Sequence, residues 1–107
     1  MTDKYIFHQN LADIFTEPPE DSIVSRTITN TDDSRVILFS FAPGQELSEH
    51  TAAMPAILHF ISGEADVVLG GDKFEAQANT WAHMEPNLPH SIYAKTAVSM
   101  LLILIKK

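Results

Sequence analysis

Histidine is the residue type in this chain that could do chemistry, because the sequence holds five histidines and no cysteine. Without thiolates, a metal ion must be bound by nitrogen and oxygen ligands, and imidazole is a common one. His90 stands out because it follows the stretch EPNLP, in which Pro86 and Pro89 restrict the backbone leading to it. A rigid backbone before His90 suits a metal ligand or a general base, since a side chain in either role loses its effect when it is misplaced by about 1 Å.

The other histidines differ in their surroundings. His50 follows the polar run PGQELSE, and by itself it would be interpreted as a solvated loop residue. Strand side chains alternate between two faces, so His59 points outward if position 56 points inward. The direction of His83 is left open by the sequence, but if Trp81 faces a cavity then His83 faces it too.

Two stretches resemble the motifs of the cupin superfamily. The first cupin motif is similar to PGQELSEHTAAMPAILHFISGE, with Gly44, His50 and Gly63 in register. The second is similar to NTWAHMEPNLPHSIYA, in which the closing histidine of the motif matches His90. Together the two stretches cover residues 44–94. The resemblance implies an all-β, cupin-like jelly-roll barrel in which His50 and His90 point into one cavity.

The sequence departs from these motifs where the family places metal ligands. Ala52 stands at the second histidine and Ala56 at the glutamate, so two of the four expected ligands are missing. We expect His50 and His90 to hold a divalent ion (Zn, Ni, Mn or Fe) only weakly, with His83 as a third ligand if it faces inward. If the chain is an enzyme, the candidate catalytic residue is His50 or His90 acting as a general base.

The second motif also carries changes in its turns. Asn79 and Asn87 replace glycines, and asparagine is the non-glycine residue that best tolerates a positive φ. Glu85 replaces a proline, and it is expected either in solvent or facing the mouth of the barrel. Ala94 replaces an asparagine. Of these changes, the two asparagines are the mild ones.

Short apolar runs between turn residues, without a sustained helical period, favour strands along the rest of the chain. The expected strands are SIVSRTITN, RVILFSF, AILHFI, the two arms of the hairpin ADVVLGGDKFEAQ, TWAHM, HSIYAK and VSMLLILIKK. We expect a single domain spanning residues 1–107, in which residues 1–20 form an N-terminal arm or an extra edge strand.

Charge and composition limit the partners. The net charge is −7, and the seven Lys and Arg residues are scattered, which argues against nucleic acid and anionic membranes as partners. The N-terminal stretch lacks a long apolar run, so a cytoplasmic location is expected. The resemblance implies a homodimer, and the runs AILHFI and VSMLLILI could supply its interface. A central strand that is buried on both faces would show the same apolar sequence pattern.

The predicted function is that of a small-molecule-binding cupin with a weakly held divalent metal. Trp81, Met84 and Met54 are the predicted pocket residues, because aromatic and thioether side chains suit an irregular cavity. The alternative is a metal-dependent oxygenase or isomerase acting on a small polar organic molecule, which needs a third protein ligand such as His83. A metal-free enzyme using His50 or His90 is the remaining possibility.

Overall fold

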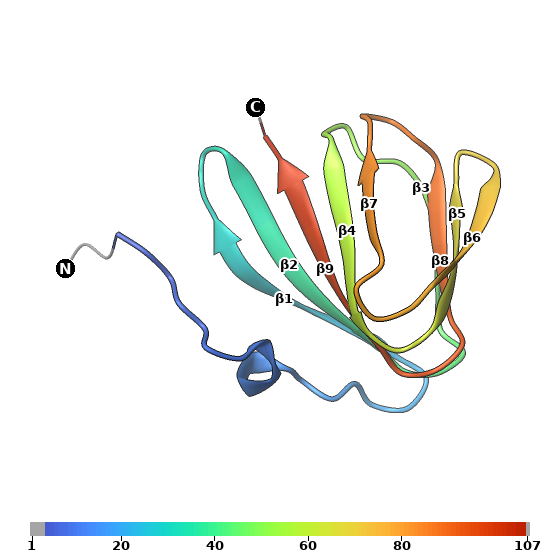
Figure 1. Cartoon of the computed structure of the whole chain (residues 1–107), viewed down its shortest axis with the longest axis horizontal. Helices are drawn as coiled ribbons and strands as arrows, with labels where there is room; N and C mark the ends of the chain where they lie inside the picture. Colours follow the sequence, from blue (N-terminus) through green and yellow to red (C-terminus); the bar gives the residue numbers. More distant parts are fainter. Residues whose placement is uncertain (1–3, 107) are drawn as a thin grey trace.

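The computed structural model describes residues 4–106, whose regular elements are strands and one short 3-10 helix (Figure 1). The elements are η1 (Leu11–Ile14), β1 (Ile23–Asn30), β2 (Ser34–Phe41), β3 (Glu46–His50), β4 (Ala56–Ser62), β5 (Ala65–Leu69), β6 (Asp72–Ala76), β7 (Trp81–Met84), β8 (His90–Ala94) and β9 (Val98–Ile105). Every expected strand is present, and the predicted all-β class is confirmed. β3 is the strand that the apolar pattern did not reveal, because its sequence ELSEH is polar.

Two antiparallel sheets face each other across the core (Figure 1). The five-stranded sheet has the order β1-β2-β9-β4-β7, and the four-stranded sheet has the order β3-β8-β5-β6. Between them lie fully buried side chains, the largest being Phe41, Phe60, Leu58, Ile92 and Met100. Two antiparallel sheets packed in this way, with chain connections that pass from one sheet to the other, form the predicted jelly roll.

Alternation along β4 shows how the sequence produces this packing. Ala56, Leu58 and Phe60 are at most 2% exposed and face the core, whereas His59 between them is half-buried on the opposite face. The prediction that His59 points away from the core is therefore confirmed.

Residues with positive φ shape the turns around the site. Asn79 and Asn87 adopt φ values of 73° and 66°, so the prediction that asparagine takes over from glycine there is confirmed. Gly63 adopts φ 88° between β4 and β5, and a Cβ on it would collide with the carbonyl group of Ala97. Glycine is needed there for two reasons, the backbone angle and the space.

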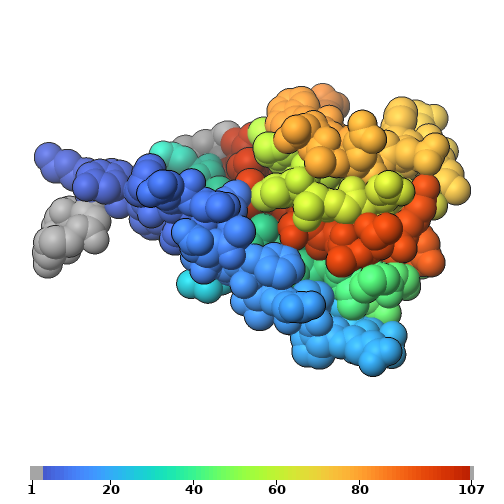
Figure 2. Space-filling view, turned by 60° about the horizontal axis from the view of Figure 1, so that its bottom comes forward, coloured from blue at the N-terminus to red at the C-terminus, as the bar shows by residue number. Residues whose placement is uncertain are grey.

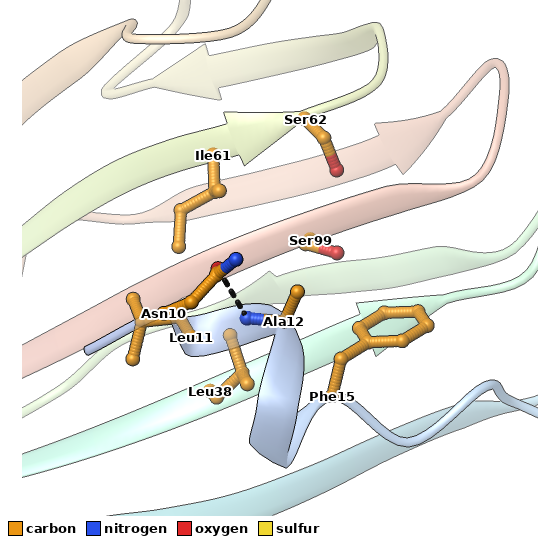
Figure 3. Close-up of a pocket in the computed structure, with 8 residues that line it drawn as sticks. All are labelled: Asn10, Leu11, Ala12, Phe15, Leu38, Ile61, Ser62 and Ser99. Carbon is orange, nitrogen blue, oxygen red and sulfur yellow. Dashed lines mark hydrogen bonds between the residues drawn. The ribbon is translucent and has the colours of Figure 1, made fainter. Parts of the chain in front are cut away.

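The N-terminal segment forms no strand between residues 4 and 22, so in the described part of the chain it is an arm and not an edge strand. Its helix η1 lies on the outer face of the five-stranded sheet, and between them is a cavity of about 320 Å³ (Figure 3). Leu11 and Phe15 line that cavity opposite Leu38 and Ile61. Residues 1–3 lie outside the described residues. In residues 4–106 no helix is long and apolar enough to cross a membrane.

Candidate functional site

The structure brings His50 and His90 together. Their ring centroids are 4.2 Å apart, with the planes tilted by 56°. They lie opposite each other at the ends of β3 and β8, although forty residues separate them in the chain. His90 is 5% exposed, whereas His50 is exposed, so one ring is buried and the other borders solvent. Two imidazoles in contact at the edge of the core form the candidate site.

A β-bulge in β3 turns His50 toward His90. Leu47 pairs with Ile92, which is fully buried in the core, so Leu47 faces inward. Regular alternation would then point position 50 outward. The register shifts between Leu47 and His50, so that His50 pairs with His90 on the inward face. Glu46 and Ser48 would share the face of His50 in a regular strand, and the bulge separates them from it.

The loop from β7 to β8 is fixed by backbone hydrogen bonds at both ends. The amide of Asn87 donates to the carbonyl of Ala52 at 2.7 Å, which joins this loop to the loop that follows His50. The amide of Gly70 donates to the carbonyl of Pro89 at 2.8 Å, directly before His90. The restriction inferred from the two prolines is therefore reinforced by contacts to two other parts of the chain.

Both imidazoles are oriented by the same kind of hydrogen bond. Nδ1 of His50 donates to the carbonyl oxygen of Ser48, and Nδ1 of His90 donates to that of Leu88, each at 2.8 Å. A carbonyl oxygen can only accept, so Nδ1 carries the proton in both rings. In the neutral form Nε2 of each ring therefore keeps its lone pair. The pair offers two acceptor nitrogens, which can bind a cation or a hydrogen-bond donor.

Burial lowers the pKa of His90 below its usual value of 6.5. The hydrogen bond to the Leu88 carbonyl raises this pKa, and the neighbouring His50 ring lowers it, but burial has the largest effect. His90 is therefore neutral near pH 7 and can act as an acceptor or a metal ligand.

The spacing of the two rings is close to what a shared metal ion requires. With Zn–N bonds of about 2.0–2.1 Å, two imidazoles have centroids about 4.5 Å apart at a right angle between the bonds and about 5 Å apart at a tetrahedral angle. If the two rings moved slightly further apart than their present centroid distance of 4.2 Å, a metal ion would fit between them. Two imidazoles fit a metal as an incomplete donor set, because structural and catalytic sites use three or four protein ligands.

The structure does not bring His83 to this pair. His83 pairs with Ile57 and Trp81 pairs with His59, so both lie in register with the outward positions of β4. Among residues 4–106, no group of three or more His, Cys, Asp or Glu side chains could hold a metal ion. Among the described residues, the histidine pair therefore has no third protein side chain positioned to share a metal ion with it.

An apolar cavity of about 500 Å³ opens between β6 and β7, where the edges of the two sheets face each other without pairing. It is lined by Phe60, Val67, Leu69 and Phe74 from the inward faces of the sheets. Leu69 is the direct cross-strand neighbour of His90, so the cavity begins next to the histidine pair.

The predicted pocket residues have different positions. Although β7 pairs them with outward positions of β4, Trp81 and His83 both line the rim of the cavity, and Trp81 is 59% exposed. Met84 is 2% exposed in the core, and Met54 is half-buried in the loop between β3 and β4. Leu69 and Phe74 were not among the predicted pocket residues. Alternation from an inward Val67 places Leu69 on the inner face, and the hairpin places Phe74 there by pairing it with Val67.

Comparison with solved structures identifies the class of this arrangement. A cupin superfamily protein from Desulfitobacterium hafniense matches with a TM-score of 0.85 and 23% identity, over 97% of each chain. A conserved protein of unknown function from Streptococcus pyogenes matches with a TM-score of 0.82 and 24% identity, over 100% of this chain and 91% of its own. A cupin 2 conserved barrel domain protein from Leptotrichia buccalis is 30% identical with a TM-score of 0.82, and the match covers 91% of this chain and 47% of that one.

No protein-family model matches the sequence, and no curated protein matches it. The fold likeness nevertheless extends over the whole chain, and the paired histidines lie where the two sequence motifs predicted them. The chain is a cupin-fold protein.

Proposed function

We propose that this chain binds a small organic molecule between its two sheets, with a polar group of the ligand at His50 and His90. The observation that carries the proposal is the contact between two imidazoles, each with its Nδ1 occupied by a backbone carbonyl. The apolar cavity that begins beside His90 at Leu69 supports a ligand with an apolar body.

The chemistry of the pair narrows the class of ligand. An imidazole whose Nδ1 donates to a backbone carbonyl accepts hydrogen bonds through Nε2, so the pair complements a hydroxyl or amino group or a divalent cation. The net charge of −7 also favours a neutral or cationic ligand over an anion. A small alcohol, phenol or amine with a compact apolar part would place its polar group at the histidine pair and its apolar part in the cavity. A weakly held divalent ion could bind to the same two Nε2 atoms.

Metal binding is tested by incubating purified protein with excess Zn²⁺, Ni²⁺, Mn²⁺ or Fe²⁺, desalting it and measuring the retained metal. We expect less than about one ion per chain, because two protein ligands hold an ion weakly. His50→Ala or His90→Ala should lower the retained amount. His59→Ala, on the outward face of β4, is the matched control and should leave the retained amount unchanged. Full retention in both site variants would place the ligands elsewhere.

Ligand binding is tested with p-cresol and its methyl ether as probes, observed by saturation-transfer NMR. The two probes share an apolar ring, but only p-cresol has a hydroxyl group to donate to an imidazole. We expect a stronger signal from p-cresol, and His90→Ala should abolish the difference between the probes. Equal signals from the two probes with the unmodified protein would contradict the proposed role of the histidine pair.

A metal-dependent oxygenase or isomerase would need a third protein ligand. The side chain proposed for that role, His83, is in register with outward positions, and no other candidate joins the pair among residues 4–106. No observation favours this second function over ligand binding.

A further inference from the structure

A second cavity, of about 320 Å³, lies on the opposite side of the five-stranded sheet from the core (Figure 3). Its floor is formed by Leu38, Ile61 and Ser99, which come from the neighbouring strands β2, β4 and β9. Its roof is the N-terminal arm, which contributes Leu11 and Phe15. None of the residues that line this cavity lines the one beside the histidine pair, so the sheet separates two distinct cavities.

The roof of this cavity is held in place by contacts at both ends of η1. The side chain of Asn10 caps the helix by accepting a hydrogen bond from the amide of Ala12 at 3.0 Å. At the other end, Ile14 is 9% exposed, and its carbonyl accepts from the Arg26 side chain of β1 at 3.5 Å. Figure 2 shows the arm lying along the body of the molecule. Because the arm is not a strand of the sheet, it can open without breaking a hydrogen bond between strands.

A row of serine side chains crosses the outer face of the sheet at this cavity. Ser99 pairs with Ser40 on β2 and with Ser62 on β4, so the three residues are cross-strand neighbours. Ser40 is 2% exposed beside the cavity, whereas Ser62 and Ser99 line it, with their oxygen atoms on the same side (Figure 3). The row therefore presents two neighbouring hydroxyl groups to the space under η1.

The hydroxyl group of Ser99 lacks a partner within the protein. Ser99 is 9% exposed, and within residues 4–106 its side chain makes no hydrogen bond. No fully enclosed side-chain oxygen in that range lacks a partner, so the Ser99 oxygen keeps some surface on the cavity. Polar groups as buried as this one are normally hydrogen-bonded. A molecule in the cavity would supply the missing partner.

The lining defines the class of molecule that the cavity accepts. Two hydroxyl groups can donate to one oxygen atom, and a carbonyl oxygen has the two lone pairs needed to accept them. Among the described residues no charged side chain lines the cavity, and the net charge of −7 disfavours an anion. The volume is about twice the 150 Å³ or so that holds benzene in an apolar cavity, which leaves room for roughly twelve non-hydrogen atoms.

We propose that the cavity under η1 is a second ligand site, which binds a small neutral carbonyl compound such as a ketone, an ester or a lactone. The carbonyl oxygen accepts hydrogen bonds from Ser99 and Ser62, and the apolar part of the molecule packs between η1 and the sheet. This site is independent of the function proposed above, because the two cavities share no lining residue.

The test uses acetophenone and α-methylstyrene, which have nearly the same shape, although only acetophenone has a carbonyl oxygen. Each probe is added at about 1 mM, a concentration suited to the weak binding of so small a molecule, to ¹⁵N-labelled protein. The shifts of the backbone amide signals are then measured by NMR. Acetophenone should shift the amides of η1 and of the strand residues beneath it. His90→Ala, which alters the other site, should leave these shifts unchanged.

Ser99→Ala removes one donor and leaves the cavity open. It should reduce the acetophenone shifts about three- to tenfold, the value of one hydrogen bond, and leave the α-methylstyrene shifts unchanged. Ser62→Ala, at an exposed position, should act in the same direction. Ser91→Ala is the matched control, because Ser91 is a half-buried strand residue on the outer face of the other sheet. It should change neither set of shifts. Circular dichroism checks that each variant folds.

The position of the site is tested by Ala12→Trp, which fills the cavity from the arm and leaves the sheet unchanged. It should reduce the shifts from both probes. Shifts that are absent from η1 in the unmodified protein, or that persist in Ala12→Trp, would overturn the site. Equal losses for the two probes in both Ser99→Ala and Ser62→Ala would overturn the role of the carbonyl oxygen.

Discussion

Replacing Gly63 by alanine should destabilise the fold far more than the same change at Gly44. Both glycines flank the strands of the first motif, and both have positive φ, 88° and 82°. A Cβ at Gly44 would meet no atom within 4 Å, whereas at Gly63 it would collide with the backbone of Ala97 and Val98, where β9 begins. The pair of variants therefore separates the cost of the backbone angle from the cost of the collision.

The backbone angle should cost each variant about 1–2 kcal/mol, because an L-residue is strained in the left-handed region. Gly63→Ala should lose a further 1–3 kcal/mol or so, since backbone atoms must shift to make room for the methyl group. The total of about 2–5 kcal/mol is a large part of the 5–15 kcal/mol or so by which a domain is stable.

The assay is urea unfolding followed by circular dichroism, with the free energy of unfolding extrapolated to water for the unmodified protein and both variants. The expected order of stability is the unmodified protein, then Gly44→Ala, then Gly63→Ala. Equal losses for the two variants would refute the reasoning, because they would mean that the corner between β4 and β5 moves freely away from Ala97.

Two further predictions concern the loop and the buried ring of the site. The pKa of His90 is lowered in the folded state, so just below pH 6.5 the unfolded chain binds more protons than the folded chain. The contribution of His90 to the free energy of unfolding should therefore be complete above pH 6.5. It should decline as the pH falls from there to the lowered pKa. His90→Gln should flatten this decline in urea midpoints measured at several pH values, and an unchanged slope would assign the decline to other groups. Asn87→Ala should cost about 1 kcal/mol because φ is positive there, while Asn87→Gly should cost little; similar losses would show that the asparagine side chain and not the backbone angle matters.

The fold was predictable because its signals are local and repeated. Once position 56 is taken as inward, alternation along AILHFI predicts the outward position of His59, and turn residues separate the other strands. The prediction at Asn79 and Asn87 rested on a conformational preference that holds in any fold. Signals of this kind do not depend on what the segment packs against.

The site was predictable only in part. The motif resemblance brought His50 and His90 together, but the face of His50 is set by a bulge that no periodicity in ELSEH reveals. The sequence left the direction of His83 open, because alternation cannot be carried through a proline-containing loop. Only the pairing of β4 with β7 assigned its face.

The bulge in β3 also determines whether the side chain opposite His90 is that of His50 or that of Glu49. If the pairing of Leu47 with Ile92 continued without the extra residue, Glu49 would lie opposite His90 and His50 would turn outward. One step of strand slippage thus exchanges an imidazole for a carboxylate beside the same buried ring. The identity of the group next to His90 is a property of local strand alignment as much as of amino-acid type, and a change of one residue in loop length is enough to alter it.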